Sequence, residues 1–225
     1  MLYFGTWGYG FAGLKGLLKS NKVKIVHVFT KWNDYSNDLF LNQVKDHSVF
    51  SNLLVTNTEK TICDNSKFSE LILAHNNIDF IISCCYDRIF TDEIMNFPKL
   101  GSINIHPSLL PKYRGIKPLE NAIINSDKET GVTFHYLSKA IDAGEIIFQK
   151  AGIKLSNNKT YKELYDEQCN LIENMVYDFF NDPFVFMKNA QTQNPENATW
   201  APRLKFTFDQ NDTVKVIKEK SKQKK

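Results

Sequence analysis

The amino-acid sequence predicts an α/β domain with a central, mostly parallel β-sheet and a short C-terminal β arm. The chain opens with an apolar strand at Leu2–Phe4, a glycine-rich segment and a helical leucine stripe, which is typical of a βαβ unit. Residues 79–86 form the most continuous apolar run, as expected of a central parallel strand buried on both faces. The 225 residues suffice for one large α/β domain plus an appendage, and a hydrophobic content of 42% excludes a disordered chain.

The strands and helices of the first half alternate along the chain. We expect strands at 2–4, 23–29, 51–56, 79–86 and 101–106 from their apolar, β-branched patterns. Helices are predicted after Gly13, over 67–76 and at 91–95.

The second half continues with a helix at 119–124, strands at 131–137 and 146–149, and a long amphipathic helix over 161–180. Short β-like pieces are predicted after Pro183, the clearest at 200–208. These patterns predict a main α/β domain over 1–189 and a β arm over 190–214 that could form a dimer interface. Residues 215–225 are predicted to be a basic, disordered tail.

Charge is unevenly distributed along the chain. The whole chain carries +3, whereas residues 215–225, with six lysines and one glutamate, carry +5, so the other 214 residues carry −2. This slightly acidic body lacks the basic surface typical of nucleic-acid binding.

The cysteines and the N-terminus predict a reduced, cytoplasmic protein. Cys63, Cys84, Cys85 and Cys169 form no C-x-x-C pair, and the chain starts without a charged, apolar signal segment. No run approaches the roughly 18 apolar residues that a membrane span needs.

Gly8, Gly10 and Gly13 match the G-x-G-x-x-G pattern of dinucleotide-binding loops. The following strand lacks the acidic residue that would bind the ribose, so an NAD site is only weakly indicated. The alternative is that these glycines permit close packing of a helix on a strand.

The strand at 101–106 brings Asn104 and His106 to the same face, because side chains two apart on a strand share a face. An Asn amide can stabilise an oxyanion, a His can move protons, and an Asp such as Asp142 can orient that His. Together they suit attack of an amine on an acyl carbon. The alternatives are a structural histidine, a turn-forming Asp142, or a zinc site built from His106, His135 and a cysteine, for which the ligand spacing is uncharacteristic.

Three blocks in order carry a resemblance to a known family: Ser102–Gly115 (SINIHPSLLPKYRG), Gly131–Thr133 and Ile141–Ile147 (IDAGEII). They resemble the formyltransferases that use N10-formyltetrahydrofolate, and the likeness runs from Phe4 to Pro202. The resemblance implies a Rossmann-like catalytic domain. The sequence looks most like the compact sugar-nucleotide N-formyltransferases.

The resemblance implies roles for individual residues. Asn104, His106 and Asp142 match the family's catalytic triad, and no metal is implied. The walls of the folate pocket match Ser83, Cys84, Cys85, Tyr86, Ile141, Ala143, Gly144 and Glu145. We expect the acceptor to contact Trp7, Tyr9, Gly10, Lys112, Tyr113, Arg114 and Arg203.

The resemblance implies transfer of a formyl group from N10-formyltetrahydrofolate to a nucleotide-linked amino sugar, such as dTDP-4-amino-4,6-dideoxyglucose or its 3-amino isomer. The product would serve surface polysaccharides such as O-antigen. We expect a homodimer that binds neither nucleic acid nor membrane. Alternatives are glycinamide ribonucleotide or methionyl-tRNA as acceptor, or a non-catalytic folate- or nucleotide-binding module. The segment Trp200–Arg203 departs from the sugar enzymes and is more similar to the tRNA enzymes.

Overall fold

The structure is a computed structural model, and it describes residues 1–30, 55–57, 70, 74, 75, 77–86 and 88–223. The described chain divides into two compact units. Unit 1 comprises Met1–Ile105 and Ile172–Pro183, and unit 2 comprises His106–Leu171 and Phe184–Lys225. Most of the helix predicted at 67–76 and the first part of the strand predicted at 51–56 lie outside the described residues.

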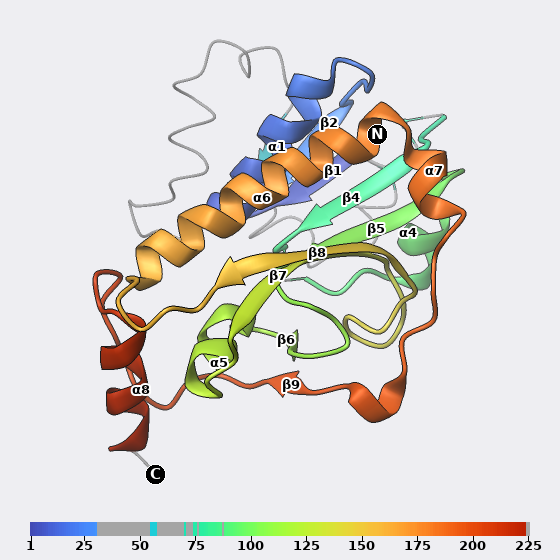
Figure 1. The fold of residues 1–225 in the computed structure, drawn as a ribbon. Helices are drawn as coiled ribbons and strands as arrows, with labels where there is room; N and C mark the ends of the chain where they lie inside the picture. The colour runs from blue at the N-terminus through green and yellow to red at the C-terminus, as the bar shows by residue number, and fades with distance from the viewer. Residues whose placement is uncertain (31–54, 58–69, 71–73, 76, 87, 224–225) are drawn as a thin grey trace. The chain divides into compact units, whose positions relative to one another are not determined.

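Unit 1 is built on a parallel sheet (Figure 1). Its strands run in the order β3-β2-β1-β4-β5, and each neighbouring pair is parallel. The strands are β1 (Leu2–Gly5), β2 (His27–Thr30), β3 (Val55–Asn57), β4 (Phe80–Cys84) and β5 (Gly101–His106); the helices include α1 (Trp7–Ser20) and α4 (Asp92–Asn96). The predicted α/β fold with a mostly parallel sheet is confirmed.

The glycines of the first helix pack it against the sheet. Helix α1 begins at Trp7, so Gly8, Gly10 and Gly13 lie inside the helix and not in a loop. A Cβ added at Gly10 would come within 2.8 Å of the Gly5 carbonyl carbon, which would force the helix away from β1. The hydroxyl of Tyr3 donates to the Gly10 carbonyl at 2.6 Å. This geometry favours the packing interpretation of the glycine pattern over the dinucleotide loop.

Unit 2 contains the antiparallel pair β7–β8 and the short parallel pair β6–β9. The long helix α6 is continuous, with residues 161–171 in unit 2 and 172–181 in unit 1. From β6 onwards the elements of the chain are β6 (Arg114–Gly115), α5 (Pro118–Ile124), β7 (Glu129–Tyr136), β8 (Ile146–Lys154), α6 (Tyr161–Asn181), α7 (Pro183–Met187), η2 (Pro195–Asn197), β9 (Trp200–Ala201) and α8 (Val214–Lys222).

The C-terminal segment differs from its prediction. The region after Pro183 begins with helix α7, and the strand predicted at 200–208 is limited to Trp200–Ala201. Pro202 follows immediately, and a proline has no N–H to continue the β6–β9 ladder. The β arm is therefore only two residues of regular strand.

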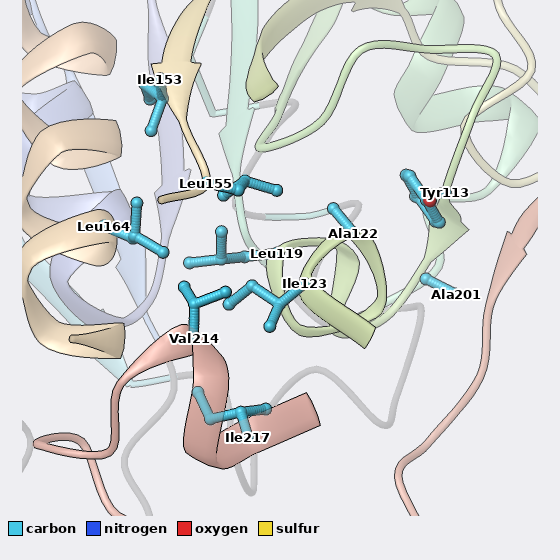
Figure 2. Packing of buried hydrophobic residues seen from close by; sticks show 10 residues of the cluster. All are labelled: Tyr113, Leu119, Ala122, Ile123, Ile153, Leu155, Leu164, Ala201, Val214 and Ile217. Carbon is cyan, nitrogen blue, oxygen red and sulfur yellow. The ribbon is translucent and has the colours of Figure 1, made fainter. Parts of the chain in front are cut away.

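The predicted disordered tail over 215–225 is wrong for residues 215–222, which belong to helix α8. Val214 and Ile217 are fully buried and join the hydrophobic core of unit 2, beside Leu119 and Ile123 of α5 (Figure 2). The Thr213 side chain caps the helix by accepting from the Val216 amide. Val214 and Ile217 lie three residues apart and form a narrow apolar stripe along the helix. The prediction of a disordered tail relied on the lysine content and did not consider this stripe.

Candidate active site

His106 ends strand β5 and is buried. Pro107 cannot extend the strand, and the Ser108 amide donates to the His106 carbonyl at 2.9 Å as the chain turns. The His106 Nε2 donates to the backbone carbonyl of Tyr113 at 2.8 Å. Because a carbonyl only accepts, this contact places the proton of the neutral ring on Nε2 and leaves Nδ1 as the atom that can gain a proton.

Asp142 lies in the loop that joins β7 to β8, next to His106. Its Oδ2 is 3.6 Å from Nδ1 of His106 and accepts from the Gly115 amide at 2.7 Å. Asp142 has a φ of +51°, in the left-handed region. The loop also needs Gly144, because a Cβ there would overlap the Tyr136 carbonyl. The structure thus brings together two of the residues that the sequence singled out.

His135 completes the cluster from β7. Its Nε2 lies 3.5 Å from Oδ1 of Asp142, and its Nδ1 donates to the Tyr136 carbonyl at 2.8 Å. The sequence analysis considered His135 as a zinc ligand and missed its place beside Asp142. A histidine within a mostly apolar predicted strand was the available signal. Among the residues that the structure describes, no group of three or more His, Cys, Asp or Glu side chains is arranged to hold a metal ion.

Burial and charge set the protonation of this cluster. Burial disfavours the charge on Asp142, but His106, His135 and the Gly115 amide outweigh it and hold the pKa of Asp142 well below its usual range. Burial also lowers the pKa of His106, and Asp142 and the Tyr113 carbonyl offset only part of this effect. At neutral pH the cluster therefore holds an ionised Asp142 and a mostly neutral His106 that can accept a proton at Nδ1.

Asn104 lies two residues before His106 on β5 and is half-buried. It is in register with Ser83 on the neighbouring strand β4. The regular strand geometry of β5 directs the side chains of residues 104 and 106 to the same face.

The first group of predicted folate-pocket residues surrounds the end of β4. Ser83 and Cys84 are buried, and the Cys84 thiol donates to the Tyr9 carbonyl at 3.2 Å. Cys85 has a φ of +52°, and its carbonyl accepts from the Thr6 hydroxyl. Tyr86 packs edge-on against Phe4, with ring centroids 5.3 Å apart.

The second group lies in the β7–β8 loop around Asp142. Ile141 is exposed, and the Ala143 amide donates to the Ala140 carbonyl at 3.2 Å. The Glu145 carboxylate accepts from the Thr192 hydroxyl at 3.1 Å. The loop therefore presents the apolar side chain of Ile141 and its backbone groups close to Asp142.

The residues predicted to contact the acceptor differ in environment. Trp7, Lys112 and Arg203 are exposed, whereas Tyr9 and Gly10 are buried in α1. The Tyr113 side chain belongs to the unit 2 core, and its backbone carbonyl binds His106. The Arg114 guanidinium donates to the side chain of Gln193, at 2.7 Å through Nη2 and 3.2 Å through Nε.

A buried cluster of Asp142, His106 and His135 in an α/β fold is typical of an enzyme active site. The family model described as formyl transferase matches residues 12–177, and the chain belongs to that family.

Curated relatives include a polymyxin resistance protein and methionyl-tRNA formyltransferases. The chain is 36% identical over 170 residues to the bifunctional polymyxin resistance protein ArnA of Wigglesworthia glossinidia brevipalpis, covering 75% of this chain but only 25% of that protein. It is 29% identical over 222 residues to the methionyl-tRNA formyltransferase of Ehrlichia ruminantium strain Gardel, covering 96% of this chain and 71% of that protein.

Solved structures share the fold. The N-formyltransferase of Helicobacter canadensis, in complex with folinic acid and dTDP-3-aminofucose, matches 98% of this chain and 79% of its own with a TM-score of 0.69 and 22% identity. The phosphoribosylglycinamide formyltransferase of Bacillus halodurans matches 81% of this chain and 96% of its own with a TM-score of 0.64 and 24% identity. No helix in the described part of the chain is long and apolar enough to cross a membrane.

Proposed function

We propose that this protein transfers the formyl group of N10-formyltetrahydrofolate to the primary amine of a nucleotide-linked amino sugar. The observation that carries the proposal is the buried contact between His106 and Asp142, 3.6 Å from Nδ1 to Oδ2, in a chain of the formyl transferase family. Asn104, on the same strand as His106, is the third member of the proposed catalytic set.

The residues divide the work of acyl transfer. As the amine nitrogen bonds to the formyl carbon, the carbonyl electron pair moves onto oxygen, where the Asn104 amide donates a hydrogen bond. His106 accepts at Nδ1 the proton that the amine loses, and the resulting cation faces the Asp142 carboxylate. The electron pair on the oxyanion then reforms the carbonyl, the bond from carbon to N10 breaks with its electron pair left on N10, and N10 takes from His106 the proton that the amine lost.

From the resemblance to formyltransferases, residues 83–86 of unit 1 and residues 140–145 of unit 2 are each proposed to contribute to donor binding. Both segments offer backbone groups at strand ends and in a loop with tight glycine geometry, which suits a planar heteroaromatic ring with several donors and acceptors. The structure of the Helicobacter canadensis enzyme with folinic acid supports a folate donor.

Two observations favour a sugar-nucleotide acceptor. The structural likeness to the enzyme solved with dTDP-3-aminofucose covers 98% of this chain. The net charge of the whole chain is only +3, which gives little electrostatic attraction for a tRNA substrate. Methionyl-tRNA is the second candidate acceptor, because the Ehrlichia ruminantium relative matches 96% of this chain.

Product formation tests the function directly. The purified chain, incubated with N10-formyltetrahydrofolate, is offered dTDP-3- and dTDP-4-amino sugars, UDP-amino sugars, glycinamide ribonucleotide and methionyl-tRNA in parallel, and products are identified by mass spectrometry. We expect one formyl group on a nucleotide sugar and none when the His106→Ala variant is used. Formylation of methionyl-tRNA alone would replace the sugar with the second candidate, and no product from any amine would refute the proposal.

A further inference from the structure

We propose that Gln193 is a positioning residue that fixes the Asp142 loop, and with it the distance between Asp142 and His106. Gln193 lies far along the chain, in the segment between α7 and β9, and belongs to no predicted functional set. The inference rests on the proposed function, in which Asp142 and His106 act as a pair.

The Gln193 side chain is buried and uses both ends of its amide. The nitrogen donates to the carbonyls of Asp142, at 2.8 Å, and Gly144, at 2.7 Å. The oxygen accepts from Nη2 and Nε of Arg114, at 2.7 and 3.2 Å. Since carbonyls only accept and a guanidinium only donates, a single orientation of the amide satisfies all four contacts.

These contacts close a ring around the Asp142 carboxylate. Gln193 holds the backbone of Asp142, and Arg114 holds Gln193. The residue after Arg114 is Gly115, whose amide donates to Oδ2 of Asp142 at 2.7 Å. One buried side chain thus connects the two segments that meet at the carboxylate.

The position of Gln193 is itself fixed by the backbone. Two residues earlier, Gln191 forms an isolated antiparallel bridge with Ile146, with N–H to carbonyl distances of 2.8 and 2.9 Å. Ile146 is the first residue of β8, directly after the Asp142 loop. The segment carrying Gln193 is therefore anchored to the strand that the loop leads into.

The Asp142 loop has a reason to need such a support. Asp142 adopts a left-handed backbone conformation, which is unfavourable for a residue with a side chain. The Gln193 amide donates hydrogen bonds to the carbonyls of Asp142 and Gly144, on the two sides of Ala143, and these bonds stabilise the left-handed conformation. If Gln193 lost its donors, the loop could relax and carry the carboxylate away from His106.

The test uses Gln193→Met, which keeps the approximate volume and neutral charge, and Gln193→Asn, a milder change that retains an amide too short for all four contacts. The control is Gln149→Met: Gln149 also donates twice, to the Leu110 carbonyl and the Thr133 hydroxyl, at 2.6 and 2.8 Å, but contacts no residue of the loop through these bonds. All proteins are checked by thermal unfolding.

The readout that does not depend on activity is the titration of the His106 imidazole, followed by NMR with labelled histidine and assigned with a His106→Gln variant. The ring faces Asp142 and His135, and withdrawal of the carboxylate removes a favourable interaction with the imidazolium. We expect the His106 pKa to fall by about one unit in Gln193→Met and by less in Gln193→Asn, while Gln149→Met leaves it unchanged.

Kinetics completes the test. We expect kcat/KM for formyl transfer to fall at least tenfold in Gln193→Met, with a smaller loss in Gln193→Asn. An unchanged His106 titration in both variants, or the same kinetic loss in Gln149→Met, would overturn the positioning role. A shifted titration in a protein whose wild type formylates no amine would instead overturn the proposed function and leave the positioning role standing.

Discussion

Nδ1 of His106 lies 3.6 Å from Oδ2 of Asp142, and both side chains are largely buried. Water screens such a pair weakly, so the charge of the carboxylate acts strongly on the ring. Burial lowers the pKa of His106 while Asp142 raises it. The balance decides whether the histidine can take a proton during the reaction and give it up again.

Replacing Asp142 with asparagine removes the charge but keeps the shape. We expect the pKa of His106 to fall further and kcat/KM for formyl transfer to drop by at least about 100-fold, because the protonated ring loses its counter-charge. NMR titration of the histidine and steady-state kinetics measure the two effects. Asp166→Asn, at an exposed carboxylate of α6 paired with Lys162, serves as the control. Full activity in Asp142→Asn would exclude the carboxylate from the mechanism.

Asn104→Ala is expected to lower kcat by about 100- to 1,000-fold with an intact fold, because one oxyanion donor is lost. Circular dichroism and the unfolding temperature establish the fold, and turnover is followed with saturating substrates. Asn189→Ala is the matched control. This exposed asparagine follows helix α7, and its side chain donates to the carbonyl of Val185 in that helix. A rate in Asn104→Ala equal to that of the control would show that residue 104 contributes no oxyanion stabilisation.

Stability is expected to fall in acid because of His27. Burial and the neighbouring His75 lower the pKa of His27 from 6.5 to about 4 in the folded state. The unfolded chain therefore binds the proton more readily, so the stabilisation from neutral His27 is complete above pH 6.5 and is lost as the pH falls through about 4. Allowing for partial screening, the loss is about 2 kcal/mol.

The comparison that isolates this effect is His27→Phe, which keeps a ring to stack on Phe29, whose centroid is 4.3 Å away. Denaturant unfolding is measured for both proteins at neutral pH and at about pH 4. The free energy of unfolding should decrease less on acidification in the variant. An equal decrease in both proteins would assign the acid sensitivity to other groups, such as Asp142 and His106.

Helix α8 is expected to contribute to stability although its sequence is rich in lysine. Ile217 is fully buried in the unit 2 core, so Ile217→Ala should reduce the free energy of unfolding by about 2–4 kcal/mol. Lys222→Ala, on the exposed side of the same helix, should change it by less than about 0.5 kcal/mol. If the two variants unfold at the same denaturant concentration, the helix does not pack as described.

Local sequence patterns predicted the parallel strands, the long helix α6 and the residues of the candidate catalytic set. These features depend on local patterns: the continuous apolar run of β4, the 3.6-residue periodicity of α6, and the polar residues at the end of β5. The three sequence blocks that resemble formyltransferases supplied the chemistry, and the family match over residues 12–177 agrees with it.

The surroundings of those residues depend on contacts between distant parts of the chain. His135 contacts Asp142 because the loop after β7 folds back on that strand. Gln193 contacts the same residue although it lies 51 residues further along the chain. Helix α8 (214–222) is stabilised because Val214 and Ile217 pack against α5. The lysine-rich composition of this segment does not predict that contact. Local patterns report propensity and periodicity, whereas contacts between distant residues depend on how the whole chain closes, and the support of the Asp142 loop belongs to the second kind.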